Sequence, residues 1–232
     1  MRKLGYRAEA TSVAGFVQQV AVSYVRHGYL WYVTGLIPEK KCCREIDGKL
    51  IEKYGIDRTE SQRAYRKKCG LSNLQYIRHG RFFAILATKG RHESFWDAEG
   101  DNIRDIRRIP LKFNGYSISY RRGGWTEPGV RDEKWRVRVQ IELQRYRELK
   151  ALFVDRSLRR SASDLEDDFR RVRFEPYAAV RWQLWAILRA VNRKRKAAGF
   201  EPLAKESVPT FRRQVKPFEG QGSDTGCLGG VA

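Results

Sequence analysis

Four acidic residues recur at every fourth position in a chain that is otherwise short of acids: Glu93, Asp97, Asp101 and Asp105. On an unbroken helix they would form a stripe of carboxylates, and oxygen ligands of this kind hold the magnesium ions of metal-dependent nucleases. Gly100 interrupts the stripe, and nearby arginines offer simple ion pairing instead. A metal-dependent nuclease centred on this stripe is therefore an alternative to a pure binding function.

Other catalytic patterns are missing from the sequence. The three histidines His27, His79 and His92 are too scattered to pair with a nucleophile or with one another. No glycine-rich loop matches a nucleotide-binding fingerprint, so we expect no cofactor. Four cysteines include no C-x-x-C pair, which predicts no metal site and suits reduced thiols in the cytoplasm.

The charge balance points to a polyanionic partner. The chain of 232 residues has 47 Lys and Arg against 27 Asp and Glu, a net charge of +20, and arginine dominates the excess. Such a surplus opposes compact folding unless a polyanion neutralises it, and nucleic acid is the first candidate. Polar residues interrupt the apolar stretch near the N-terminus, so we expect no signal peptide, no spanning helix and no membrane partner.

The segment 49–68 has the spacing of a helix-turn-helix. One helix ends at Gly55, Ile56 fills the corner, and Thr59 with Gln62 forms a capping box that opens a second, basic helix. In this interpretation Leu50, Ile51, Ile56 and Ala64 are buried, although Ser61 stands where an aliphatic residue is usual. A hairpin over 74–88 follows in the position of a wing. The residues expected to contact DNA are Ser61, Gln62, Arg63, Arg66 and Lys67 on the helix, with Arg78 and Arg81 at the hairpin tip.

An arginine-lined hairpin and strand form a second candidate surface. Arg136 and Arg138 alternate with Val137 and Val139, so the two arginines should share one face of a strand. Aromatic residues lie among the cations, and such a sheet can follow a phosphate backbone and stack bases. The alternative is a sheet whose aromatic side chains are core and whose arginines pair with acids. The predicted contacts here are Arg107, Arg108, Lys112, Arg121, Arg122, Arg136 and Arg138.

A third basic cluster ends the predicted helix over 177–198, which carries an apolar stripe with Trp182 and Trp185 nearby. Cations in the last turn complement the helix dipole, and contact with phosphate is compatible with that role. The cluster is Arg193, Lys194, Arg195 and Lys196.

The elements that position these groups predict an α+β protein. We expect a winged-helix-like N-terminal half, a small antiparallel sheet and a helical C-terminal third. Residues 92–106 should be helical with a break near Gly100, and Asn114–Gly115 should turn a hairpin between 109–113 and 116–121. The expected divisions are 1–90, a basic helix-turn-helix and wing-like half; 91–204, a basic α+β half; and 205–232, a flexible tail.

Together these patterns predict a nucleic-acid-binding protein that prefers DNA and contacts it through the helix-turn-helix-like segment and arginine–phosphate pairs. A role in replication or in a mobile element suits two contact regions. The alternatives are an RNA-binding or ribonucleoprotein component that uses the aromatic–cationic sheet, and the nuclease described above. Binding rather than catalysis is the expected activity, and the sequence does not indicate an oligomeric state.

Overall fold

A computed structural model describes residues 5–92, 94–123, 125–127, 130–131, 133–212 and 214–218, with the backbone alone at 125–127 and 130–131. The chain forms two compact units. The first takes in the chain up to Pro110, Tyr120–Val137 and the segment from Val215 on, and the second takes in Leu111–Ser119 and Arg138–Gln214. The division expected near residue 90 therefore falls inside the first unit.

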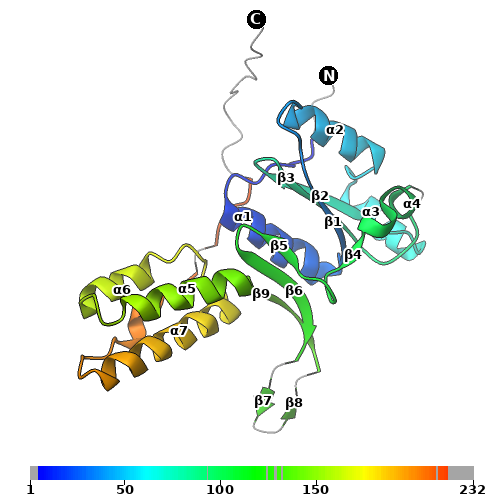
Figure 1. The fold of residues 1–232 in the computed structure, drawn as a ribbon. Coiled ribbons are helices and arrows are strands. Elements are labelled where there is room, and N and C mark those ends of the chain that lie inside the picture. The colour runs from blue at the N-terminus through cyan, green and yellow to red at the C-terminus, as the bar shows by residue number, and fades with distance from the viewer. Residues whose placement is uncertain are drawn as a thin grey trace, which may run out of the picture. The chain divides into compact units, whose positions relative to one another are not determined.

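The first unit is built on a four-stranded sheet with strand order β2-β3-β1-β4 (Figure 1). Strand β1 pairs antiparallel with both β3 and β4, and β2 and β3 form an antiparallel hairpin. A π-helical turn (Gln19–Tyr24) continues α1. The elements of this part are α1 (Val13–Gln18), β1 (Trp31–Leu36), α2 (Cys43–Lys53), α3 (Glu60–Lys68), β2 (Leu74–His79), β3 (Phe82–Ala87), α4 (Phe95–Glu99) and β4 (Arg104–Asp105).

Both faces of this sheet are covered. The register aligns Val33, Ile85 and Tyr76, so they share a face, and they pack in one core with Ile51 of α2 and Phe95 of α4. On the opposite face α1 contacts the sheet, where the rings of Phe16 and Phe82 meet edge to face at 5.7 Å. Strands β2 and β3 are therefore largely buried, and their hairpin is part of the core.

A three-stranded sheet of order β5-β6-β9 follows. Asn114 and Gly115 make the turn between β5 and β6 with positive φ angles of 44° and 79°, as the sequence predicts for this hairpin. Between β6 and β9 the chain forms the short antiparallel pair of β7 and β8. The strands are β5 (Leu111–Phe113), β6 (Tyr116–Arg122), β7 (Trp125–Glu127), β8 (Val130–Arg131) and β9 (Trp135–Ile141).

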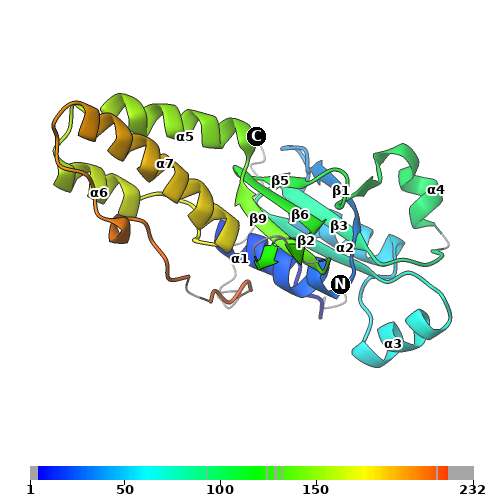
Figure 2. The same cartoon turned by 90° about the horizontal axis from the view of Figure 1, so that it is seen from below.

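Three helices complete the second unit: α5 (Leu143–Arg156), α6 (Ala162–Arg170) and α7 (Ala178–Ala197). Figure 2 shows α5 and α7 running side by side. Apolar side chains of all three meet in one core that includes Phe153, Phe169 and Leu184. None of the helices in the described residues combines the length and apolar composition needed to cross a bilayer.

The α+β class and the helical C-terminal part are confirmed, whereas the winged-helix arrangement is not. Two local predictions are wrong. The break expected near Gly100 is present, with φ at +40°, but in the described part of 92–106 only α4 and a 3₁₀ turn (Gly100–Asn102) are helical, and Arg104–Asp105 is a strand. The tail expected from residue 205 begins inside the fold, since Val208 is buried in the helical core and the Val215 amide donates to the Gln18 side chain at 3.1 Å.

Candidate nucleic-acid interface

The described residues of Tyr120–Val137, with the adjoining Arg138 of β9, form a segment that we call the hairpin arm. Strand β5 pairs only with Tyr116–Ile118, so beyond this point β6 has β9 as its one strand neighbour in the described chain. The Gly123 amide donates to the Lys134 carbonyl at 3.2 Å and closes the ladder toward the tip. The arm is therefore a two-stranded ribbon (Figure 1).

The arm has one face with stacked aromatic rings and an opposite face with arginines alone. The rings of Tyr120 and Trp135 stack at 5.4 Å with an interplanar angle of 21°, which fixes them on one face, and Arg122 lies 5.8 Å above the Trp135 ring. By strand alternation Arg121 and Arg136 point to the other face. The sequence predicts this alternation, and burial confirms it: Arg136 and Arg138 are exposed while Val139 is buried.

The arm carries a cluster of exposed positive charges. Arg121, Arg122, Arg136 and Arg138 are all exposed. In the described part of the chain, no carboxylate lies within ion-pair distance of Arg121, Arg122 or Arg138. Trp135 is 41% exposed although it belongs to the same face as the buried Val139. The arm thus presents Arg121, Arg136 and Arg138 on one face, and Arg122 with the half-buried Tyr120 and the exposed Trp135 on the other.

Helix α3 differs from a reading helix. The capping box forms as predicted, with the Thr59 amide donating to Gln62 Oε1 at 3.0 Å. However, α3 buries no side chain, and Ala64, which a helix-turn-helix would bury, is exposed. The helix is held instead by polar contacts such as Arg66 donating to the Ser72 carbonyl at 3.0 Å and Asn73 donating to the Arg63 carbonyl at 2.9 Å.

Of the contacts predicted on α3, some side chains are held by hydrogen bonds within the protein and others are exposed. Gln62 is engaged in the capping box, and Arg63 donates to the Arg58 carbonyl. Ser61 and Lys67 are exposed.

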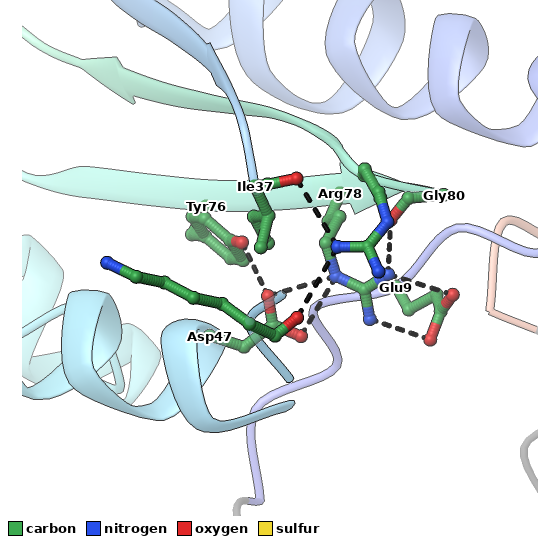
Figure 3. A network of polar contacts seen from close by, with 8 residues as sticks. Glu9, Ile37, Asp47, Tyr76, Arg78 and Gly80 are labelled. Carbon is green, nitrogen blue, oxygen red and sulfur yellow. Dashed lines mark hydrogen bonds and ion pairs between the residues drawn. The ribbon is translucent and has the colours of Figure 1, made fainter. Parts of the chain in front are cut away.

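Arg78 does not lie at a wing tip, which corrects the prediction. Its side chain is 4% exposed, and its Nε donates to both oxygens of Asp47, at 3.0 and 3.1 Å. Its terminal nitrogens donate to Glu9 at 3.0 and 2.8 Å, and Tyr76 donates to Asp47 at 2.5 Å. Figure 3 shows these groups converging between α2 and β2. Because every charge here is paired, this network stabilises the fold and offers no surface for a ligand.

Burial controls the titration of the network. Desolvation raises the pKa of Asp47 above its ordinary value, although the hydrogen bond from Tyr76 and the charge of Arg78 oppose the rise. Burial, together with the Asp47 carboxylate, raises the pKa of Tyr76 strongly. The neighbouring Arg81 is also structural, since its guanidinium donates to the carbonyls of Pro38 and Glu39 at 2.6 and 2.8 Å.

The cations preceding the arm are mostly paired. Arg107 forms a two-pronged ion pair with Asp105, with distances between 2.8 and 3.0 Å. Partial burial alone would raise the pKa of Asp105, but the hydrogen bonds from Arg107 outweigh it and lower the pKa. Lys112 pairs with Glu142 at 2.8 Å, and Arg108 is exposed.

The basic cluster of α7 divides into structural and exposed members. Arg195 is buried, and its guanidinium donates to the carbonyls of Ser157 and Glu201 at 2.8 and 2.7 Å, so its predicted role as a contact is wrong. Lys194 donates to the Val154 carbonyl at 3.1 Å. Arg193 and Lys196 are exposed.

The acidic stripe is not assembled on one helix. Asp97 lies on α4, Asp101 on the 3₁₀ turn and Asp105 in β4, where it pairs with Arg107. Glu93 lies outside the described residues. No group of three potential metal-ligating side chains occurs in the part of the chain that the structure describes. Asp97, Asp101 and Asp105 are therefore not aligned on one helix, the arrangement that would favour the nuclease alternative.

No protein-family model, curated protein or solved structure matches the chain.

Proposed function

We propose that this protein binds nucleic acid, that duplex DNA is its preferred ligand, and that the hairpin arm is the main contact. The observation that carries the proposal is the face of a two-stranded ribbon that holds Arg121, Arg136 and Arg138, all exposed. An arginine fork binds phosphate or the edge of guanine through two hydrogen bonds. The proposal moves the main contact from α3 to the arm, because α3 lacks the buried side of a reading helix.

The shape of the arm favours DNA over RNA. The major groove of B-form DNA admits a two-stranded β-ribbon, whereas the major groove of an RNA duplex is too deep and narrow for side chains to read. The arm has the required two strands from Tyr120 onward. The excess of +20 across the chain supplies the long-range attraction that steers a polyanion to this surface.

The experiment is a salt titration of affinity with a charge-neutralised arm. In the variant Arg121→Gln/Arg136→Gln/Arg138→Gln three phosphate contacts are lost. The plot of log K against log salt concentration for a labelled duplex should therefore become less steep by about 2.7, which is 0.9 for each contact. Fluorescence anisotropy of the duplex at several salt concentrations measures the slope for the wild type and the variant.

A matched control replaces three exposed arginines that lie outside the arm. Arg145, Arg159 and Arg170 are exposed and pair with Glu148, Asp155 and Asp167 respectively. Their replacement by Gln changes the net charge by the same amount, and we expect a much smaller change of slope. Equal changes in the two triple variants would mean that overall charge, and not the arm, binds the duplex. Tighter binding of RNA than of DNA would favour the alternative, in which bases stack on Tyr120 and Trp135.

A further inference from the structure

Helix α7 exposes a tryptophan, Trp182, that does not belong to the hydrophobic core of the helical unit. Trp182 is 64% exposed, while Leu184, Ile187 and Leu188 on the same helix are buried. Its ring meets Trp185 edge to face at 5.8 Å, with an interplanar angle of 84°. Trp185 packs partly against the helical core, so it holds the neighbouring ring in a defined orientation. One aromatic ring is thus fixed at the surface with most of its area in water.

Cations continue the same face of the helix. Arg189, Arg193 and Lys196 follow Trp182 at intervals of seven, four and three residues, which places all four side chains on one side of an α-helix. All three cations are exposed. At a rise of 1.5 Å per residue, the face from Trp182 to Lys196 is about 21 Å long. Lys205 adds a further cation, 5.3 Å from the Trp185 ring.

Negative charge does not balance this face. Helix α7 contains no Asp or Glu in its twenty residues, and in the described residues no carboxylate pairs with Arg189, Arg193 or Lys196. The helix dipole favours cations in the last turn, but it falls off within that turn and does not account for Arg189. Arg189 and Arg193 are four residues apart, a like-charge spacing that destabilises a helix. An anionic ligand would relieve this repulsion.

We propose that the α7 face formed by Trp182, Arg189, Arg193 and Lys196 binds single-stranded nucleic acid. An unpaired base would stack on Trp182, and the three cations would contact the phosphates that follow it along the helix. A duplex offers no free base for such a ring, whereas base–aromatic stacking is the usual contact with single strands. The inference rests on the proposed function and adds a second ligand class, a single-stranded segment bound by a surface separate in sequence from the hairpin arm.

The test compares a single strand with a duplex. Labelled oligothymidylate and a labelled duplex are titrated with the full chain and with Trp182→Leu, Trp182→Phe and the pair Arg189→Gln/Arg193→Gln. We expect Trp182→Leu to weaken oligothymidylate binding by about 5- to 150-fold, the loss of one stacked base. Trp182→Phe should retain much of the affinity because it keeps a ring. The double variant Arg189→Gln/Arg193→Gln should make the plot of log K against log salt concentration for oligothymidylate less steep by about 1.4, or 0.7 for each contact with a single strand.

Controls separate this inference from the proposed function. Leu152→Ala, on the exposed side of α5, removes an apolar side chain that is 43% exposed and should leave both affinities unchanged. If the wild type binds the duplex and Trp182→Leu binds oligothymidylate as tightly as the wild type does, the α7 face does not bind single strands, while the proposed function stands. Failure of the wild type to bind either nucleic acid would overturn both. Loss of binding to anionic lipid vesicles in Trp182→Leu, with oligothymidylate binding unchanged, would assign the face to a membrane surface and also overturn the inference.

Discussion

Replacing Arg78 by Met should destabilise the fold and leave the DNA-binding surface intact. The guanidinium lies between Asp47 and Glu9, and the side chains of Arg78 and Asp47 are 4% and 8% exposed. Removing it leaves the Asp47 carboxylate buried, with the hydroxyl of Tyr76 as its remaining described side-chain donor. Loss of one partner from a buried ion pair costs about 3–5 kcal/mol. This is a large part of the stability of a small domain, which is about 5–15 kcal/mol.

The assay is urea denaturation, followed by circular dichroism, of the wild type and four variants: Arg78→Met, Asp47→Asn, Glu9→Gln and the double variant Asp47→Asn/Arg78→Met. Glu9→Gln should cost less than about 1 kcal/mol, because the Glu9 side chain is 40% exposed and its ion pair is screened by water. The double variant Asp47→Asn/Arg78→Met should be less destabilised than the sum of the two single changes, by about 0.5–3 kcal/mol, since it leaves no unpaired charge. These differences should appear as shifts of the midpoint with little change of slope.

The pH dependence gives a second check with a definite sign. Burial already raises the pKa of Asp47, and loss of Arg78 should raise it further. The folded variant then binds the proton of Asp47 more tightly than the unfolded chain does, so its stability falls as pH rises through the folded pKa. The destabilisation by Arg78→Met should therefore be smaller at about pH 5 than at about pH 8. If Arg78→Met kept the stability of the wild type but bound DNA more weakly, the structural role of Arg78 would be refuted, and the residue would again be a candidate DNA contact.

Two further predictions concern the first unit. Gly90 has a φ of +136°, and a Cβ there would lie 2.6 Å from the backbone of Leu71 and Ser72, so Gly90→Ala should lower the free energy of unfolding by more than about 2 kcal/mol. Gly70 also has a positive φ but open space around its Cβ position, so Gly70→Ala should lower it by about 1–2 kcal/mol. Thermal denaturation of both variants checks this order. Because the pKa of Asp105 is lowered in the folded state, the stability it contributes is present above its ordinary pKa and lost as pH falls through the folded value. Acid titration of stability should therefore be steeper for the wild type than for Asp105→Asn, and an identical acid limb in the two proteins would contradict this role.

Local signals in the sequence were sufficient for most elements. The capping box of Thr59 and Gln62 and the turn at Asn114–Gly115 depend on neighbouring residues alone, and both form as expected. The alternation of Arg136 and Arg138 with valines likewise gave the faces of β9, because a strand fixes its side-chain period.

Burial of the basic side chains depends on contacts that sequence spacing does not contain. Arg78 has the same local pattern as an exposed strand arginine, but its partner Asp47 lies 31 residues away on α2. Arg195 sits in a run of four cations, yet the carbonyls of Ser157 and Glu201 enclose it. The exposure of Trp182 likewise cannot be predicted from sequence spacing. The absence of acids from α7 is visible in the sequence, and it indicates that the positive charge of this helix is not balanced within the helix.

Photocrosslinking to a duplex identifies the residues of the protein that contact DNA. A duplex that carries a photoreactive base or backbone group is irradiated with the full-length protein at near-physiological salt, and the attached peptides are identified by mass spectrometry. We expect crosslinks within the hairpin arm, Arg138 included, and their loss in the variant Arg121→Gln/Arg136→Gln/Arg138→Gln. Crosslinks confined to residues 59–68 would contradict the arm and return the contact to α3. A protein that gives no crosslink and no salt-dependent binding would contradict nucleic-acid binding itself.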